Sequence, residues 1–192
     1  TQNLNELYAL NGHPGTGRDT ELQQMMLGLL SYETPNLLLT GAPGVGKTTL
    51  VHMLASLIAQ GLCPMYLTGK QIIAVNTNEL LAGPGYRGVT EEKFQKLIDF
   101  AVNQQKILFF DEGHTITHLG EMSNGSTPGF GNMLKPYLTS GKLRVILATT
   151  TEEVKQINDS ALLRRFIEVE VGEPSDSTLI RIAEKAFELY TQ

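Results

Sequence analysis

One nine-residue stretch of this chain restricts its possible folds more than any other part of the sequence. Residues 41–49 read Gly-Ala-Pro-Gly-Val-Gly-Lys-Thr-Thr, which contains the pattern Gly-x-x-x-x-Gly-Lys-Thr. The apolar run Asn36–Thr40 precedes the stretch, and apolar residues recur after it at helical spacing up to Gly61. A strand, a glycine-rich turn and a helix in this order form a phosphate-binding loop, whose backbone N–H groups surround an anion at the helix N-terminus.

The loop assigns different tasks to its side chains. In this pattern Lys47 reaches the β- and γ-phosphates of a nucleoside triphosphate, and the Thr48 hydroxyl takes a place on Mg²⁺. The residues predicted to bind the nucleotide are Gly41, Ala42, Pro43, Gly44, Val45, Gly46, Lys47, Thr48 and Thr49.

A second motif adds the groups needed for hydrolysis. The apolar run from Lys106 ends in the carboxylates Asp111 and Glu112. Open α/β sheets bind ligands at the carboxyl ends of their strands, so this pair is expected beside the loop. Asp111 would hold Mg²⁺, and Glu112 would polarise the attacking water as a general base. The metal ligands predicted are therefore Thr48 and Asp111.

Apolar strands alternate with amphipathic helices along the chain, which predicts an α/β fold with a parallel sheet covered on both faces. The expected strands are Leu37–Thr40, Ile72–Asn76, Ile107–Asp111, Val145–Thr149 and Ile167–Val171. One helix is expected to begin near Asp19 as its N-cap, and another to begin at Thr90. Gly83–Gly88 and Gly120–Gly131 are rich in turn residues and are predicted to be loops.

Three further candidates leave alternatives open. His114 and His118 are four residues apart, but Thr115 stands where a zinc protease needs Glu, so His114 is expected either as a polar residue behind the site or at the edge of the core. Thr150 follows a strand and either senses the γ-phosphate or merely ends the strand. The pair Arg164 and Arg165 is either a solvated surface feature or an arginine finger.

Composition excludes several classes of protein. The formal net charge of −5 and the lack of a basic cluster argue against nucleic acid as the main partner. The one cysteine, Cys63, excludes an internal disulfide and fits a reducing compartment, so a cytoplasmic location is expected. No run of apolar residues reaches the length of about 20 that a membrane span needs. The chain does not begin with Met, and a piece of a longer protein is expected.

Together these motifs resemble the AAA+ ATPases, and within them the first ATPase module of the ClpA/ClpB/ClpC class of unfoldases and disaggregases. The resemblance covers about residues 15–180 and is carried by Gly17-Arg18-Asp19, Gly41–Thr49, Leu81–Gly88, Ile107–Glu112 with His114, Gly131–Pro136, Ala148–Thr150 and Ala161–Phe166. It implies one AAA+ nucleotide-binding domain over residues 1–192, with a three-layer α-β-α fold. The implied sheet has five parallel strands in the order 5-1-4-3-2.

The resemblance also implies roles for individual residues. Tyr86 and Arg87 match a pore loop that grips a polypeptide threaded through a ring, and Gly120–Gly131 matches a second loop facing that pore. Thr150 matches the sensor threonine. Arg164 and Arg165 match the fingers that reach the nucleotide of a neighbouring subunit. The backbone at Thr16 and Gly17 matches the segment that holds adenine.

The implied function is Mg²⁺-dependent ATP hydrolysis that drives unfolding, disaggregation or translocation of proteins through a ring pore. ATP or ADP and Mg²⁺ are the implied cofactors. The implied partners are other subunits, as a hexamer at full length, with unfolded or aggregated polypeptides and a possible partner protease. This piece alone is expected to be monomeric and slow, because the helical lid, a second module and an N-terminal domain of the class are not in the sequence.

The chain departs from the class at two positions beside the predicted site. Gly113 follows the carboxylate pair where Ile or Ala is usual, which predicts a looser backbone there. Leu163 replaces the usual acidic residue before the arginines. The segment from Thr150 to Arg164 is about two residues shorter than is usual in the class, which predicts a shorter reach of the arginines.

Two other functions are compatible with a phosphate-binding loop. One is an ATP-dependent switch or assembly factor of clamp-loader or transposition type acting on DNA, which the acidic balance disfavours. The other is a module that binds nucleotide without turnover, which Glu112 disfavours.

Overall fold

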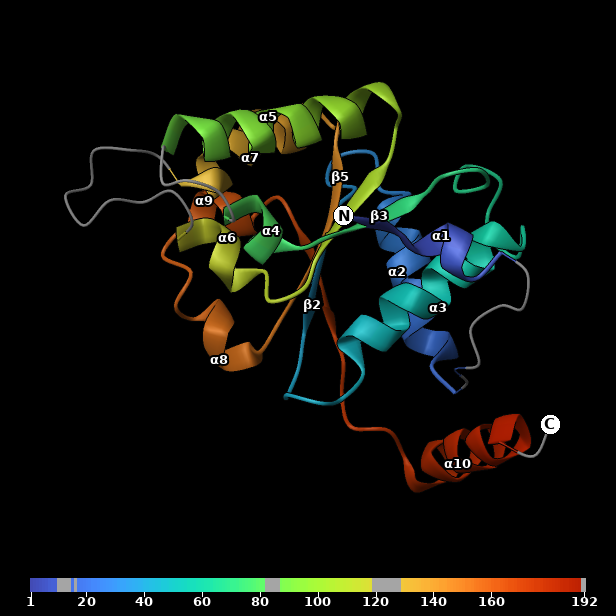
Figure 1. Cartoon of the computed structure of the whole chain (residues 1–192). Coiled ribbons are helices and arrows are strands. Elements are labelled where there is room, and N and C mark those ends of the chain that lie inside the picture. The colour runs from blue at the N-terminus through green and yellow to red at the C-terminus, as the bar shows by residue number, and fades with distance from the viewer. Residues whose placement is uncertain (10–14, 16, 82–86, 119–128, 191–192) are drawn as a thin grey trace.

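The sheet of this protein lies between two layers of helices (Figure 1). The computed structural model describes residues 1–9, 15, 17–81, 87–118 and 129–190. The strands are β1 (Gln2–Asn3), β2 (Leu37–Thr40), β3 (Ile72–Val75), β4 (Ile107–Phe110), β5 (Arg144–Thr149) and β6 (Ile167–Glu170). The helices are α1 (Leu4–Leu7), α2 (Asp19–Leu29), α3 (Lys47–Ala59), α4 (Thr77–Leu81), α5 (Arg87–Asn103), α6 (His114–His118), α7 (Phe130–Thr139), α8 (Thr151–Val154), α9 (Ser160–Leu163) and α10 (Asp176–Tyr190).

The strand order across the sheet is β1-β3-β4-β5-β2-β6. Strands β2 to β6 are parallel, and when they are numbered one to five their order is the predicted 5-1-4-3-2. The prediction of five strands was wrong by one, because β1 adds an antiparallel strand beside β3. A strand of two residues has no hydrophobic period to read, so the sequence did not indicate it.

Each face of the sheet has its own hydrophobic core. Helices α1, α2 and α3 cover one face, and α5, α7 and α9 cover the other (Figure 1). Alternate residues of β2 pack into the two cores: Leu37 and Leu39 face α2 and α3, and Leu38 faces α5 and α7. On that second face the rings of Phe94 and Phe130 stack at 4.2 Å. Burial on both faces explains why β3 and β4 are apolar throughout and β2 is apolar up to Thr40, whereas β6 at the side of the sheet exposes Glu168 and Glu170.

Most predicted elements are present with small changes of their ends. Strand β2 has the predicted bounds, and β3, β4 and β6 each end one residue earlier. Asp19 is the first helical residue of α2 and not its N-cap, which is Arg18 with no capping side-chain bond. Helix α5 begins at Arg87, inside the segment predicted as a loop, and α7 likewise begins at Phe130. Cys63 is half-buried and packs at the edge of a core.

Helix α3, which follows the glycine loop, ends where the sequence predicts. The N–H of Gly61 donates to Ile58 (3.1 Å) and the N–H of Leu62 donates to Leu57 (2.8 Å). Gly61 has a φ of 71°, so these two bonds form the left-handed glycine cap that commonly terminates helices.

Buried Asn5 fixes the N-terminal segment to the P-loop helix. Its Nδ2 donates to the carbonyls of Ala55 (3.2 Å) and Lys70 (3.1 Å), and its Oδ1 accepts from the N–H of Ile72 (2.7 Å). One side chain therefore joins α1, α3 and the start of β3, and it holds β1 against the edge of the sheet.

We expect Asn5→Ala to lower the free energy of unfolding by about 2–3 kcal/mol, because the buried N–H of Ile72 loses its acceptor. Urea unfolding of the variant measures this loss. Gln23→Ala on the exposed side of α2 is the control and should stay within about 0.5 kcal/mol. An equal effect of the two substitutions would contradict the role given to Asn5.

Candidate active site

The strand order brings the predicted site residues together at the carboxyl ends of the parallel strands. Strand β5 lies between β2 and β4, with Thr40 opposite Thr149 and Phe110 opposite Leu147. The residues that follow these three strands therefore adjoin one another. A hollow of about 450 Å³ lies there, lined by Pro43, Gly44, Gly46, Lys47, Thr48, Thr49, Asp111, Glu112, Thr149, Thr150 and Glu153.

The glycine loop turns directly into helix α3. Gly46 is the N-cap of the helix and has a φ of 98°, and Gly44 has a φ of 78°. Residues with a Cβ rarely adopt these angles, so the loop needs glycine at both positions. The curled backbone brings the N-terminus of a 13-residue helix to the hollow, where the helix dipole favours an anion.

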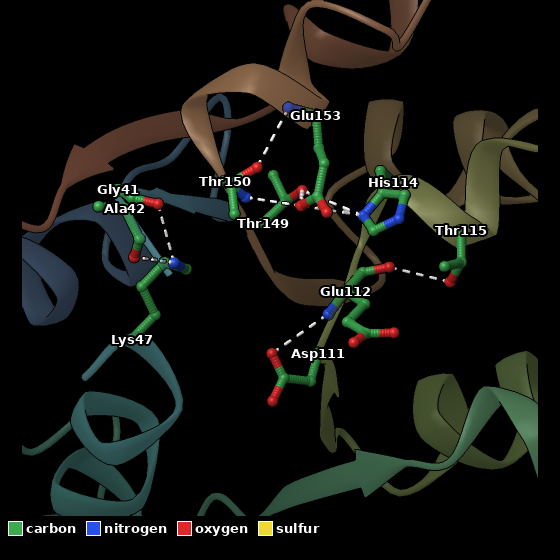
Figure 2. A network of polar contacts seen from close by, with 10 residues as sticks. All are labelled: Gly41, Ala42, Lys47, Asp111, Glu112, His114, Thr115, Thr149, Thr150 and Glu153. Carbon is green, nitrogen blue, oxygen red and sulfur yellow. Dashed lines mark hydrogen bonds and ion pairs between the residues drawn. The ribbon is translucent and has the colours of Figure 1, made fainter. Parts of the chain in front are cut away.

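Lys47 bends back onto its own loop (Figure 2). Its Nζ donates to the carbonyl oxygens of Gly41 and Ala42, each at 2.9 Å. The ammonium group therefore lies inside the loop and beside the hollow. A phosphate entering the hollow would take the place of these carbonyls as its partner.

The two predicted metal ligands are in contact. The hydroxyl of Thr48 donates to Oδ2 of Asp111 at 2.7 Å, although the residues are 63 positions apart. A hydroxyl and a carboxylate are hard oxygen ligands of the kind Mg²⁺ prefers, and Mg²⁺ usually keeps several waters beside one or two such ligands. Both residues border a hollow that also contains Lys47, so this donor set fits Mg²⁺ bound together with a triphosphate.

Glu112 has an unusual backbone conformation. Its φ is 54°, in the left-handed region that residues other than glycine seldom occupy. Its N–H donates to Asp111 (3.1 Å), and its carbonyl accepts from both the N–H and the hydroxyl of Thr115, each at 2.9 Å. These bonds hold the chain in a sharp turn right after β4, and the turn leaves Glu112 on the wall of the hollow. Such strained residues cluster at functional sites.

Gly113 is held firmly, contrary to the looser backbone that the sequence suggested. Its N–H donates to the carbonyl of Ala148 at 2.8 Å. A Cβ at this position would come within 2.9 Å of the Cβ of Leu147, closer than real Cβ atoms approach. The absence of a side chain here lets the turn at Glu112 pack directly against β5.

A polar network fills the end of β5 (Figure 2). Glu153 accepts from the hydroxyl of Thr149 (2.9 Å) and the backbone N–H of Thr150 (2.9 Å), and its Oε2 lies 3.2 Å from Nδ1 of His114. The Thr150 hydroxyl in turn accepts from the N–H of Glu153, which completes a capping box for α8. His114 is therefore at the edge of the core, as predicted.

The comparisons with known proteins agree with this geometry. Residues 37–173 match the family "ATPase family associated with various cellular activities (AAA)". The chain belongs to the AAA family of ATPases. It is 42% identical over 173 residues to the Staphylococcus aureus (strain USA300) protein "ATP-dependent Clp protease ATP-binding subunit ClpL", covering 88% of this chain and 25% of that protein. The chain thus spans about a quarter of the length of the curated relatives it matches.

Solved structures of Hsp104 have the same fold as this AAA domain. A closed-state cryo-EM reconstruction of Hsp104 with ATPγS and FITC-casein matches with a TM-score of 0.86 at 30% identity, covering 98% of this chain and 32% of that one. The S. cerevisiae Hsp104–ADP complex matches with a TM-score of 0.84 at 30% identity, covering 96% and 26% of the two chains. The resemblance to the Clp class of AAA+ proteins is thereby confirmed.

Arg164 and Arg165 lie near the amino ends of the parallel strands, whereas the hollow lies at their carboxyl ends. They precede β6, whose Ile167 pairs with Leu37 at the start of β2, whereas the glycine loop follows Thr40 at its end. The three steps from Leu37 to Thr40 alone span about 10 Å. The AAA domain therefore does not bring its arginine pair to its own hollow.

The remaining predicted site residues are only partly described. Gly17 has a φ of 80°, and its backbone approaches Thr178 of α10. Thr16 and Tyr86 lie outside the described residues, as does most of the segment Gly120–Gly131. Arg87 is the first residue of α5. Among the described residues no group of three or more His, Cys, Asp or Glu is suited to hold a metal ion. No helix in that part is long and apolar enough to cross a membrane.

Two residues of the site had no role predicted from the sequence. Buried Arg18 donates through Nη2 to the carbonyls of Val45 (2.8 Å) and Gly172 (3.0 Å), and through Nη1 to Glu21 (2.7 Å). It thus ties the glycine loop to the segment after β6. Glu153 organises the end of β5. The available signals were the place of Arg18 in the Gly-Arg-Asp motif and the spacing of Thr150 and Glu153, which is that of a capping box.

The network at Glu153 predicts a loss of stability in acid. The hydrogen bond from the Thr150 backbone N–H, helped by the Thr149 and Thr150 hydroxyls, lowers the pKa of Glu153 below its ordinary value of 4.5. A lowered pKa in the folded state stabilises the protein above pH 4.5, and this stabilisation is lost as the pH falls through the lower value. We expect Glu153→Gln to lower stability at pH 7 and to reduce the loss on acidification.

Urea unfolding between about pH 7 and pH 3 measures this difference. Glu173→Gln is the control, because Glu173 is exposed in the segment after β6. Parallel pH curves for wild type and Glu153→Gln would contradict the assignment.

Proposed function

We propose that this AAA domain binds and hydrolyses ATP with Mg²⁺, and that the hydrolysis drives unfolding, disaggregation or translocation of other proteins. One observation carries the catalytic part of the proposal. The Thr48–Asp111 contact, Lys47 and Glu112 all border one hollow at the helix N-terminus. A domain that only held nucleotide would not need a strained carboxylate beside the γ-phosphate position.

The residues present divide the work in a simple way. Lys47 would leave the Gly41 and Ala42 carbonyls and bind the β- and γ-phosphates. Mg²⁺, when bound, neutralises phosphate charge, and Thr48 and Asp111 would hold it. Glu112 would accept a proton from the attacking water. The Thr150 hydroxyl accepts from the N–H of Glu153 and lies at the wall of the hollow, where it would donate to the γ-phosphate.

The arginine pair supports assembly into a ring. Arg164 and Arg165 are at the far edge of the sheet from the hollow of their own chain, so they would serve the nucleotide of a neighbouring copy. Each site would then be completed by two subunits, as a hexamer at full length. An isolated domain of this kind would turn over slowly, because the transition-state charge lacks its arginine.

Protein substrates are supported by the relatives and by Tyr86. The Hsp104 reconstruction contains casein, and the relative ClpL is named as an ATP-binding subunit of a protease. A glycine-flanked aromatic residue can grip any extended chain by apolar contact without reading its sequence. A partner protease and a cytoplasmic location belong to this same proposal.

The catalytic part is tested with Glu112→Gln. We expect ATP turnover to fall by about 10²–10⁴-fold, because the amide cannot accept the proton, while ATP affinity is retained. Phosphate release and binding of a fluorescent ATP analogue measure the two properties. Lys47→Ala is the complementary variant, and it should lower affinity itself. Equal turnover by wild type and Glu112→Gln would disprove the catalytic assignment.

The mechanical part is tested with Tyr86→Ala in the full-length protein. We expect unfolding of a model substrate to be lost while ATP turnover changes by less than about threefold, because the aromatic grip and the phosphate site are separate. Tyr32→Ala is a matched control, since the Tyr32 side chain is 99% exposed in the loop after α2. Normal unfolding by Tyr86→Ala would refute the pore-loop role.

A further inference from the structure

A second hollow lies at the amino ends of the parallel strands. It has a volume of about 730 Å³, and its walls include Pro35, which precedes β2, Tyr66 from the segment between α3 and β3, and Arg144, the first residue of β5. Thr149, at the other end of β5, lines the hollow beside the glycine loop. The length of β5 therefore separates the second hollow, which we call the Arg144 hollow, from the proposed ATP site.

A compact turn places Tyr66 beside Arg144. The N–H of Leu67 donates to the carbonyl of Pro64 at 2.8 Å, and the fully buried Leu67 side chain anchors the turn in the core. Tyr66, the residue before it, stays exposed. Nη2 of Arg144 donates to the Tyr66 hydroxyl at 2.7 Å, and Cζ of Arg144 lies 5.1 Å from the centroid of the Tyr66 ring. This tyrosine therefore fixes the orientation of the guanidinium group.

The guanidinium group of Arg144 has unused donors. A guanidinium carries five N–H donors, and within the described part of the chain the Arg144 side chain has one acceptor, the Tyr66 hydroxyl. Its Nε is buried without a hydrogen-bond partner there, and no carboxylate of the described residues forms an ion pair with it. Buried donors rarely lack an acceptor in folded proteins. A ligand with anionic oxygens would supply the acceptors that this group lacks.

Positive charge gathers around the Arg144 hollow. Nζ of Lys70 lies 5.6 Å from the centroid of the same Tyr66 ring. Burial lowers the pKa of Lys70, and repulsion by the charge of Arg144 lowers it further. Lys142 is exposed two residues before Arg144. Of the described residues that line the hollow, Glu33 alone is acidic. This region is therefore basic on a chain with a net charge of −5, and it favours an anion.

Other walls of the Arg144 hollow are apolar. Leu30 is half-buried at the end of α2, and it lines the hollow together with buried Pro35 and the exposed ring of Tyr66. Sites for small molecules usually combine an apolar lining with a few fixed polar groups, and have volumes of about 300–1,000 Å³. The Arg144 hollow has both properties, so a ligand that fits it carries an apolar part as well as an anionic one.

We propose that the Arg144 hollow binds a small ligand in which a carboxylate or a phosphate group is attached to an apolar body. Arg144 would hold two oxygens of the anion through parallel N–H donors, because its planar fork matches the spacing of oxygens in both groups. The apolar body would lie against Leu30, Pro35 and Tyr66. Tyr66 is also a positioning residue, since it orients the guanidinium. This site is separate from the proposed ATP site, and neither proposal depends on the other.

The test measures the binding of four compounds to the full-length protein by isothermal titration calorimetry, with saturating Mg²⁺–ADP to fill the proposed nucleotide site. N-acetylphenylalanine carries a carboxylate, and N-acetylphenylalaninamide is its neutral counterpart. Phenyl phosphate carries a phosphate on a ring, and inorganic phosphate lacks the ring. We expect at least one of the two ring-bearing anions to bind about tenfold tighter than its counterpart. Tighter binding of the carboxylate identifies the end or acidic side chain of a polypeptide as the source, and tighter binding of phenyl phosphate identifies a phosphate ester.

Three variants locate the binding. Arg144→Met should weaken it about tenfold or more, because the charge and the donors are lost. Arg144→Lys keeps the charge but loses the fork, so its affinity should be intermediate. Lys155→Met removes an exposed cation after α8 and should stay within about twofold of the wild type. Circular dichroism checks that each variant is folded, and Arg144→Lys decides if Arg144→Met does not fold.

Four results would overturn the proposal. They are no binding of either ring-bearing anion at about 10 mM, binding of both counterparts as tight as that of the anions, an affinity that the folded Arg144 variants leave unchanged, and binding that Mg²⁺–ADP abolishes. The last result would place the anion in the phosphate-binding loop instead.

Discussion

Strand β5 lies between β2 and β4, and the geometry of the site follows from this pairing. The parallel ladder sets Thr40 opposite Thr149 and Phe110 opposite Leu147, which brings three strand ends to one edge. The glycine loop, the carboxylate pair and the threonine network each follow one of these strands. None of them is close to another in sequence, so the pairing of apolar strands buried on both faces is what assembles them.

Residues that do not line the hollow stabilise the turns around it. Arg18 binds the carbonyl of Val45 behind the glycine loop, and Gly113 packs the turn at Glu112 against Leu147. Asn5 holds α3, the helix that follows the glycine loop, by donating to the carbonyl of Ala55. Preorganised groups of this kind let an active site stabilise charge without rearranging during the reaction.

The sequence predicted the parts of the structure that repeat a pattern. Apolar strands and amphipathic helices have a period, and the five parallel strands and their order were therefore predictable. The two-residue strand β1 has no period, and it depends on the contacts of Asn5 with residues up to 67 positions away. The positive φ of Glu112 and the carbonyl partners of Arg18 are also tertiary effects. The glycine loop and the pair Asp111 and Glu112 were identified because their chemistry requires a fixed spacing of residue types.

The contacts of Lys47 have a consequence for nucleotide exchange. Its ammonium group donates to the carbonyls of Gly41 and Ala42, so the backbone of the glycine loop itself provides partners for this cation. Hydrogen bonds from a charged donor are worth roughly 1.5–3 kcal/mol, and an arriving nucleotide must compete with them. If Lys47 binds phosphate as proposed, these internal bonds would lower the net affinity for nucleotide and would favour its exchange over tight storage.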